Sequence, residues 1–351
     1  MSVLQIPNVK IVGIASCVPK NIDENINYPG VSEKEIKNLI EGIGVERKRI
    51  ADKQTCTSDL CFKAAEKLID NLGWDKKEID CLIFVSQTPD YILPATSCIL
   101  QNKLGLSNEC YAADISLGCS GYVYGLSMIS SLISHGSIKK GLLLVGDTTS
   151  KTTSPFDKTS WPLFGDAGTA TAIEYQNGEK GIMFHNASDG SGANAIIIPD
   201  GGYRNFINKN TLKFQEIEEG VKRNNTHCIL EGMDVFSFAI TKAPKSIKKI
   251  LELSEQTVDS IDLLILHQAN LMLNETIVKK LKIEKSKVPY SLKNYGNTSS
   301  ASIPLTLTTE KRNDLENSKL KIVICGFGVG LSWATAYFET NKIICPELIE
   351  Y

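Results

Sequence analysis

Ile79-Asp80-Cys81-Leu82-Ile83-Phe84-Val85 decides the fold, because Ile261-Asp262-Leu263-Leu264-Ile265-Leu266-His267 repeats its pattern about half a chain later. Each stretch follows a helical segment after a short polar turn, and each holds an apolar run as long as one buried strand. Such near-continuous apolar runs are typical of a sheet that is covered on both faces. The two stretches therefore predict equivalent strands in two related units.

Two further pairs of segments match in the same order. Residues 142–146 resemble 322–326, and Ala170-Thr171-Ala172 matches Ala334-Thr335-Ala336. Three matches in one order indicate a duplicated α/β unit. We expect its two halves to be residues 1–175 and 176–351.

The segments between the apolar runs carry helix and loop signals. A stretch rich in Gly, Asn and charged residues, 186–228, predicts an inserted loop or hairpin. Apolar residues recur at spacings of three and four in the expected helices, which are 58–71, 119–134, 234–252 and 272–281.

Composition excludes several classes of protein. A chain of 351 residues is longer than one core usually fills, which agrees with two fused halves. The net charge of -2 gives no electrostatic reason to expect nucleic acid or an anionic membrane as a partner. No apolar run approaches the roughly 20 residues of a membrane span, and residues 1–10 lack the features of a signal peptide. The ten cysteines form no Cys-x-x-Cys pair, so we expect no metal site and a reducing, cytoplasmic location.

Cys119 is the candidate nucleophile. It lies in Asp114-Ile115-Ser116-Leu117-Gly118-Cys119-Ser120-Gly121, where a short strand over 111–115 is expected to run through a glycine turn into a helix. A thiol at a helix N-terminus faces unpaired N–H groups and the positive end of the helix dipole, which favour the thiolate. A buried structural cysteine is the alternative at this position.

His267 and Asn297 are the expected partners of Cys119. His267 directly follows the run 263–266, at the carboxyl end of a buried strand, where ligands collect in open α/β sheets. By the repeat, Asn297 occupies nearly the place in the second half that Cys119 occupies in the first. Two helix starts that face each other across a pseudo-twofold axis would bring the three side chains together. The alternatives are a core histidine and an asparagine that only caps a helix.

A glycine-rich loop, Gly326-Phe327-Gly328-Val329-Gly330, offers exposed backbone N–H groups. Alternating glycines also occur in plain turns. Together with the N–H of Cys119, the loop is a candidate oxyanion hole.

Five segments together resemble β-ketoacyl-acyl carrier protein synthase III, a family with the thiolase fold. They are Asp114 to Gly121, Phe164-Gly165-Asp166-Ala167-Gly168, His267-Gln268-Ala269-Asn270, Gly296-Asn297-Thr298-Ser299 and Gly326 to Gly330. The segments occur in family order and span nearly the whole chain. The resemblance implies an α/β, thiolase-like fold of two duplicated halves in α-β-α-β-α layers, usually as a homodimer.

The resemblance also implies an acyltransferase that needs no metal or redox cofactor. Cys119 would take an acyl group from a thioester of coenzyme A or acyl carrier protein. His267 and Asn297 would donate hydrogen bonds to the carbonyl of malonyl-acyl carrier protein or another malonyl-thioester as it loses carbon dioxide, and the carbanion would attack the acyl group. The N–H groups of Cys119 and Val329 would hold the oxyanion. The other residues that this resemblance places beside the substrate are Asn270, Phe327 and Gly328.

The chain departs from the family where coenzyme A and the carrier protein bind. Many members carry Trp and Arg near the first Gly-Ile turn, where they clamp adenine, but residues 38–42 include neither. An Arg before the Phe-Gly-Asp motif becomes Lys158, which keeps the charge without the planar fork. A basic residue that meets the carrier protein becomes Met272, whereas Lys279 and Lys280 remain on the following helix.

One more departure concerns the acyl pocket. The aromatic residue that often reaches in from the partner subunit aligns with Leu93, and Phe236 matches a pocket-lining aromatic. We therefore expect an acyl pocket that differs from the pocket of an acetyl-primed enzyme.

Three functions stay open at this point. Decarboxylative condensation in fatty acid, polyketide or related specialised metabolism is favoured by Asn297, because that residue serves enolate formation. Acyl transfer from a thioester to a hydroxyl or amine remains an alternative because the donor-clamp positions are altered. A non-catalytic partner subunit is the third reading, and the complete set of Cys119, His267 and Asn297 argues against it. The His-Gln-Ala-Asn block favours synthase III over type III polyketide synthases.

Overall fold

The apolar runs form strands of two mixed sheets in the computed structural model, which describes residues 2–351. The first sheet has the strand order β17-β2-β8-β7-β5-β6. Its strands are β2 Val9–Val18, β5 Cys81–Val85, β6 Tyr111–Ile115, β7 Lys140–Thr148, β8 Asp166–Tyr175 and β17 Ile349–Glu350. The second sheet has the order β1-β9-β16-β15-β14. Its strands are β1 Ser2–Ile6, β9 Ile182–Ser188, β14 Leu263–Leu266, β15 Lys319–Gly328 and β16 Ser332–Asn341.

The three repeated segments occupy equivalent places in the two sheets. The first pair gives β5 and β14, the second gives β7 and β15, and the third gives β8 and β16. In each sheet the first of these strands pairs in parallel with the second, and the second pairs antiparallel with the third. The duplicated fold that the sequence predicted is therefore confirmed.

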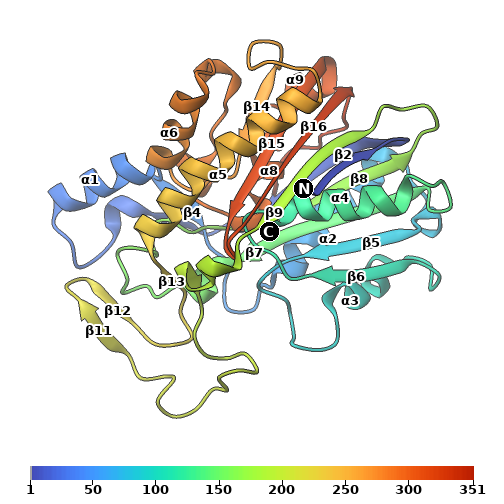
Figure 1. The fold of residues 1–351 in the computed structure, drawn as a ribbon. Helices are drawn as coiled ribbons and strands as arrows, with labels where there is room; N and C mark the ends of the chain where they lie inside the picture. Colours follow the sequence, from blue (N-terminus) through green and yellow to red (C-terminus); the bar gives the residue numbers. More distant parts are fainter. Residues whose placement is uncertain (1) are drawn as a thin grey trace.

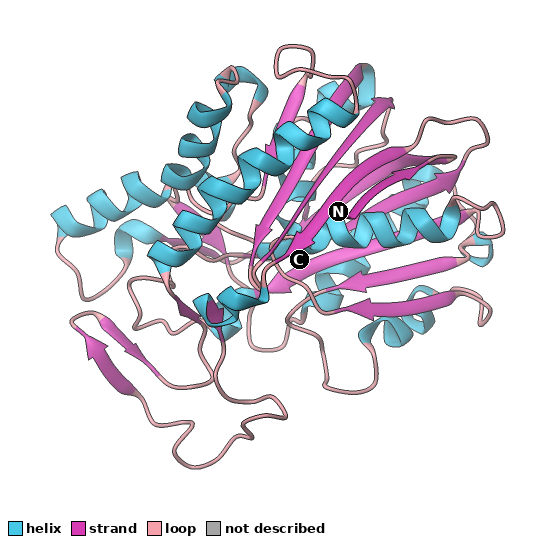
Figure 2. Cartoon of the chain, in the orientation of Figure 1, coloured by secondary structure: helices cyan, strands magenta, loops and turns pink. Residues whose placement is uncertain are grey.

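Helices separate and cover the two sheets (Figure 1). Helices α4 and α8 contact strands of both sheets, α2 covers the outer face of the first sheet, and α5 covers the outer face of the second. These contacts give the order helix, sheet, helix, sheet and helix, and Figure 2 shows the helices lying against the sheets. The expected helices are present with ends shifted by one or two residues. The α-helices are α1 Glu33–Ile43, α2 Thr57–Leu72, α3 Thr96–Leu104, α4 Gly121–Ile133, α5 Gly232–Leu253, α6 Leu271–Leu281, α7 Leu292–Tyr295, α8 Ser302–Glu310 and α9 Arg312–Asn317.

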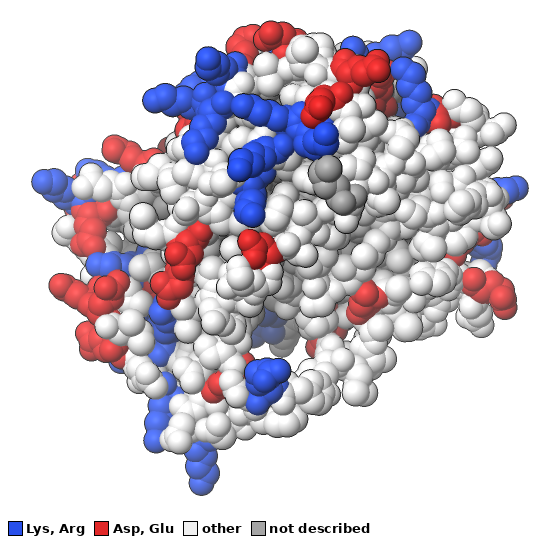
Figure 3. All heavy atoms as spheres, viewed as in Figure 1, with Lys and Arg blue, Asp and Glu red and all other residues white. Residues whose placement is uncertain are grey.

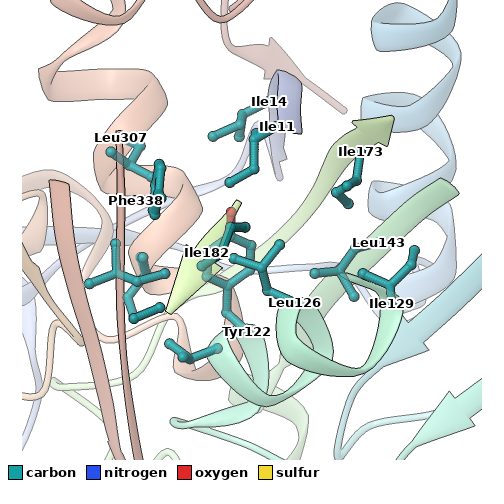
Figure 4. Packing of buried hydrophobic residues seen from close by; sticks show 14 of the residues in the cluster. Ile11, Ile14, Tyr122, Leu126, Ile129, Leu143, Ile173, Ile182, Leu307 and Phe338 are labelled. Atoms are coloured by element: carbon teal, nitrogen blue, oxygen red, sulfur yellow. The ribbon is translucent and has the colours of Figure 1, made fainter. Parts of the chain in front are cut away.

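The central core lies between the sheets and draws on both halves of the chain (Figure 4). Leu126 and Ile129 on α4 pack near Leu143 on β7, while Leu307 on α8 and Phe338 on β16 approach from the second half. All five side chains are buried. Truncating such a core leucine to alanine typically costs about 2–5 kcal/mol, so this layer holds the halves in fixed register.

The ends of the chain exchange sheets. Strand β1 pairs with β9 in the second sheet, and β17 pairs with β2 in the first. Strand β8 ends at Tyr175, next to the expected division near residue 175. That division stays a prediction, because each sheet includes one terminal strand from the opposite end of the chain.

The expected insertion forms a group of short strands beside the sheets. Strands β10 Ile196–Ile197 and β13 Ile229–Leu230 pair at its base, and β11 Gln215–Glu218 and β12 Val221–Arg223 form a hairpin farther out. The remaining pair, β3 Ile22–Glu24 and β4 Arg47–Arg49, flanks α1. Among residues 2–351, no helix is both long and apolar enough to cross a membrane.

Candidate active site

Glycines bring the candidate nucleophile and the candidate oxyanion loop into contact. Cys119 lies between β6 and α4, two residues before the helix begins. A Cβ on Gly328 would lie 2.7 Å from Cys119 Sγ, and a Cβ on Gly326 would lie 2.8 Å from the Cys119 carbonyl oxygen. A Cβ on Gly118 would lie 2.2 Å from Gln87 Oε1. Any larger residue at these positions would displace the loops, so the glycines set the close approach of the two chain segments.

The thiol of Cys119 receives hydrogen bonds, and the residue is only partly exposed. Burial raises its pKa to about 11, and hydrogen bonds from Val329 N–H, from its own N–H and from Ser299 oppose that rise. The sequence predicted that the helix start would favour the thiolate. In the structure desolvation outweighs that effect, because Cys119 stands outside the first turn of α4 in an enclosed pocket. The nucleophile therefore needs a proton acceptor.

His267 directly follows β14, as predicted, and is buried. Its backbone N–H donates to Cys325 O at 2.8 Å, and the edge of its ring meets Phe327 with centroids 5.6 Å apart. Burial lowers the pKa of His267 to about 3, and a hydrogen bond with the Ser299 backbone opposes that shift only in part. The imidazole is therefore neutral at neutral pH.

Ser302 contacts the Nδ1 side of the His267 ring. Its Oγ lies 2.7 Å from His267 Nδ1 and accepts from Gln268 N at 3.4 Å. A hydroxyl can donate one hydrogen bond and accept others, so Ser302 can pair with either neutral tautomer. His267 Nε2 can thus accept a proton in one tautomer and donate one in the other.

Asn297 is held by the motif Phe164-Gly165-Asp166. Its backbone N donates to Leu163 O at 2.9 Å, and its O accepts from Gly165 N at 3.1 Å. A Cβ on Gly165 would lie 2.2 Å from Tyr295 O, so only glycine permits this contact. The Asn297 side chain accepts from Ser299 N at 2.9 Å and donates through Nδ2 to Ala269 O at 3.3 Å. One Nδ2 hydrogen is left for a substrate.

A pocket of about 360 Å³ brings these residues together. Cys119, His267, Asn297 and Val329 line it, as does Ser299. Its remaining walls are mostly apolar: Leu163, Phe164, Ile196, Ile197, Ile198, Cys228, Leu230, Val235, Leu273 and Phe327. A thiol, an imidazole, an amide and two nearby backbone N–H groups in one apolar pocket are the groups that acyl transfer requires.

Sequence comparison agrees with this geometry. Residues 113–198 match the family described as 3-oxoacyl-[acyl-carrier-protein (ACP)] synthase III, and residues 251–340 match its C-terminal family. A β-ketoacyl-[acyl-carrier-protein] synthase III from Clostridium perfringens is 34% identical over 333 residues, which cover 95% of this chain and 99% of that protein. The chain belongs to the 3-oxoacyl-[acyl-carrier-protein] synthase III family. It is thus an acyltransferase of the ketoacyl synthase type.

Solved structures of the synthase III family extend the comparison. A 3-oxoacyl-(acyl-carrier protein) synthase from Burkholderia xenovorans is 40% identical with a TM-score of 0.94, and the match covers 99% of each chain. The synthase III of Aquifex aeolicus has a TM-score of 0.81 at 25% identity, covering 95% of this chain and 100% of that one. A priming β-ketosynthase from a polyketide pathway has a TM-score of 0.81 at 21% identity, which concerns the fold alone.

Three of the expected substrate residues line the pocket and three do not. Asn270, Phe327 and Gly328 are part of its wall, although the Asn270 side chain accepts from Leu273 N at 2.8 Å as the cap of α6. Val235 takes the place expected for Phe236, because the next residue of a helix points about 100° away. Phe236 packs instead against the core around α5.

Lys158 and Leu93 lie outside this pocket in the synthase III chain. Lys158 forms an ion pair with Glu35 at 3.0 Å. Leu93 is 75% exposed, which is the position expected of a side chain that meets a second subunit.

Asp147 was not predicted as a site residue from the sequence. Its buried carboxylate accepts from Gln87 N at 2.7 Å and Ser86 Oγ at 3.0 Å in the first half, and from Ser300 Oγ at 2.6 Å in the second. Burial raises its pKa, whereas these donors lower it. Its position directly after the apolar run 142–146, at the carboxyl end of a buried strand, could have indicated a site residue.

Replacing Ser302 by alanine should slow condensation. Ser302→Ala leaves His267 Nδ1 without its partner, and an unsatisfied buried group costs about 1–3 kcal/mol, or roughly tenfold to hundredfold in rate. The matched control is Ser130→Ala, because Ser130 Oγ has no hydrogen-bond partner within residues 2–351. Steady-state formation of the β-keto product measures the effect. Full activity in Ser302→Ala would show that His267 needs no support from this hydroxyl.

Proposed function

We propose that the chain loads an acyl group from a thioester onto Cys119 and condenses it with a malonyl-thioester to give a β-ketoacyl-thioester. The observation that carries this proposal is the shared pocket of Cys119, His267 and Asn297, with Val329 N–H directed at the sulfur. Neither half supplies all of these groups alone.

Loading begins with proton transfer from the Cys119 thiol to His267 Nε2. The sulfur forms a bond to the thioester carbonyl carbon, and the N–H groups of Cys119 and Val329 hold the oxyanion. The original C–S bond then breaks, and the departing thiolate takes the proton from His267. The acyl group remains on Cys119, and His267 is neutral again.

Condensation uses the other tautomer of His267. Nε2–H and the second Nδ2–H of Asn297 donate to the carbonyl oxygen of the malonyl-thioester. The bond to the carboxylate carbon breaks, carbon dioxide leaves, and the electron pair forms an enolate that these donors stabilise. The α-carbon attacks the acyl group, the bond to Cys119 breaks, and the sulfur regains a proton from solvent.

The apolar wall of the pocket selects the acyl group. Ile197 and Leu230 stand on the paired strands at the base of the insertion, and Val235 follows at the start of α5. These aliphatic side chains favour an acyl chain longer than acetyl, since each buried methylene contributes about 0.8 kcal/mol.

The malonyl group is brought by acyl carrier protein. Lys279 and Lys280 stand in the last turn of α6, which begins at the pocket wall. Met272 is 60% exposed at the start of the same helix, so an apolar contact replaces the expected ion pair there. The ten cysteines are unpaired within residues 2–351, which fits a reducing cytoplasm.

The working unit is a homodimer joined at β6. This strand is the edge of the first sheet and pairs only with β5 among the described residues. Tyr111 on β6, Met128 on α4 and Leu4 on β1 leave apolar surface exposed around a groove of about 1170 Å³. An unpaired strand edge beside an apolar face invites pairing with a second copy.

A charge in this groove should separate the dimer. Met128 is 46% exposed in the single chain, so the Met128→Glu variant should still fold. The added carboxylate should weaken association of the two copies. Light scattering after size-exclusion chromatography should report 38.5 kDa for the variant and twice that mass for the wild type. Leu212→Glu, on the insertion, is the control and should remain dimeric. A monomeric wild type would contradict the proposed interface.

The direct test of function supplies acyl-thioesters of several chain lengths with malonyl-acyl carrier protein and follows the products by mass spectrometry. Wild-type protein should form a β-ketoacyl product, and Cys119→Ala should lose it by at least about 1,000-fold because no acyl-enzyme can form. Acylation of Cys119 without a keto product would instead favour transfer to a hydroxyl or amine. A preference for acetyl donors would contradict the proposal that the pocket favours acyl chains longer than acetyl.

The decarboxylation step should tolerate mild acid. His267 is neutral until the pH approaches about 3, so its donor tautomer persists between about pH 8 and pH 5. Decarboxylation of the malonyl-thioester by Cys119→Ala isolates this step from loading, and its rate should stay flat across that range. A rate that falls by half near pH 6.5, the ordinary value for histidine, would mean that the imidazole titrates as if exposed.

A further inference from the structure

Val329 belongs to the short turn between β15, which ends at Gly328, and β16, which begins at Ser332. Gly328 and Gly330 flank Val329 with φ angles of 157° and 136°. Glycine adopts such angles because it has no Cβ, and it accepts many others equally well. The backbone alone therefore does not fix the direction of the Val329 N–H, which has to meet the sulfur of Cys119 on the other half of the chain.

A side chain at the far end of the turn holds Val329 in place. Ser332 Oγ donates to Val329 O at 2.9 Å. Ser332 is buried, and it does not belong to the wall of the pocket. The peptide units are planar, so only the φ and ψ of Val329 separate its C=O from its N–H. Fixing the carbonyl therefore restricts the N–H that is directed at the sulfur.

A second hydroxyl continues this contact to the residue after the nucleophile. Ser120 Oγ lies 2.7 Å from Ser332 Oγ, and both side chains are buried. A hydroxyl carries one hydrogen and a carbonyl oxygen can only accept. Ser332 therefore donates its hydrogen to Val329 O, and Ser120 donates to Ser332.

These hydroxyls join the two sides of the oxyanion hole. Ser120 directly follows Cys119, whose N–H is one donor, and Val329 supplies the other. The two segments are in close contact here, since a Cβ on Gly326 would lie 2.9 Å from Ser120 Cα. Removing either hydroxyl therefore alters the relative position of the two donors without altering the pocket wall.

Backbone hydrogen bonds hold the rest of the turn. Leu331 N donates to Asp189 O at 3.2 Å, and Asp189 N donates to Leu331 O at 2.8 Å. Gly328 and Ser332 also face each other in the ladder between β15 and β16. Loss of the Ser332 hydroxyl should therefore release Val329 while the turn stays folded.

We propose that Ser120 and Ser332 are positioning residues of the oxyanion hole, which hold the Val329 N–H against the carbonyl oxygen of the acyl group. The inference rests on the proposed function, because it concerns the tetrahedral intermediates of loading and condensation. Neither hydroxyl contacts the substrate. Their effect belongs to the steps in which an oxyanion forms at the nucleophile. Loss of carbon dioxide depends on His267 and Asn297 and lies outside it.

Acylation of Cys119 in a single turnover gives the first readout. Each protein is mixed with acyl-coenzyme A thioesters from acetyl to decanoyl, and intact-protein mass spectrometry follows the acyl-enzyme. Ser332→Ala should load roughly tenfold more slowly at saturation. This loss is smaller than the roughly 100- to 1,000-fold loss on deleting an oxyanion donor, because the Val329 N–H is displaced and not removed. The donor concentration at half the maximal rate should stay within about twofold, since Ser332 does not line the pocket.

Decarboxylation separates positioning from a general loss of structure. Release of carbon dioxide from malonyl-acyl carrier protein is measured in Cys119→Ala with and without Ser332→Ala, and the two rates should agree within about twofold. Ser16→Ala is the matched control, because Ser16 and Thr308 form another buried hydroxyl pair at 2.7 Å between the two halves, away from the pocket. It should change neither step.

Ser120→Ala gives a graded variant and also serves if Ser332→Ala does not fold. It keeps the bond from Ser332 to Val329 O and removes one hydrogen bond behind it, so loading should slow only about threefold. The double variant should load no more slowly than Ser332→Ala, because both residues act through one carbonyl.

Salt should not change these ratios. Screening acts on exposed charges, such as the lysines that gather over α5 in Figure 3, and hardly at all on a buried contact between uncharged groups. The ratio of wild-type to Ser332→Ala loading rates at saturation should therefore be the same at low and high ionic strength.

Two results would overturn the inference. One is a Ser332→Ala protein that loads at the wild-type rate. The other is equal slowing of loading and decarboxylation, because the hydroxyl would then support the whole site and not the oxyanion hole. Absence of Cys119 acylation in the wild type with every donor would instead refute the proposed function, and this inference with it.

Discussion

The carboxylate of Asp147 is the interaction on which the site depends, because it accepts hydrogen bonds from both halves of the chain. Gln87 N and Ser86 Oγ come from the end of β5, and Ser300 comes from the turn after Asn297. Burial of a charge is costly unless donors compensate it, and here several donors converge on the two oxygens. The price of enclosing one carboxylate is thus offset by joining the segment after β5 to the turn that carries Asn297.

The close approach of backbone to backbone follows from this junction. Gly118 lies against Gln87, and Gly326 and Gly328 lie against Cys119. Gly326 and Gly328 remove side chains where segments from opposite halves would otherwise collide, and Gly118 does so between two segments of the first half. Packing at this distance lets main-chain N–H groups reach the sulfur, and such donors need no reorganisation during reaction. The arrangement also desolvates the thiol, which explains why it depends on a neighbouring base.

The sequence predicted the features that depend on local pattern. The runs 82–85, 142–145, 263–266 and 322–325 became strands because their periodicity is local. His267 could be placed because it ends such a run, and the repeat related Asn297 to Cys119. The hydrogen bond of Ser302 to His267 and the ion pair of Lys158 with Glu35 join residues far apart in sequence. No periodicity reports such contacts. Val235 lines the pocket and the predicted Phe236 does not, since one residue along a helix rotates the side chain to another face.

The exchange of terminal strands has a consequence for how the protein is made. Strand β1 is synthesised first, yet its partner β9 begins at residue 182. The first sheet likewise receives its edge strand β17 from residues 349–350, far along the chain from its partner β2. Chains are synthesised from the N-terminus, and domains generally fold as units. The N-terminal half therefore cannot complete its sheet until residues 349–350 have left the ribosome.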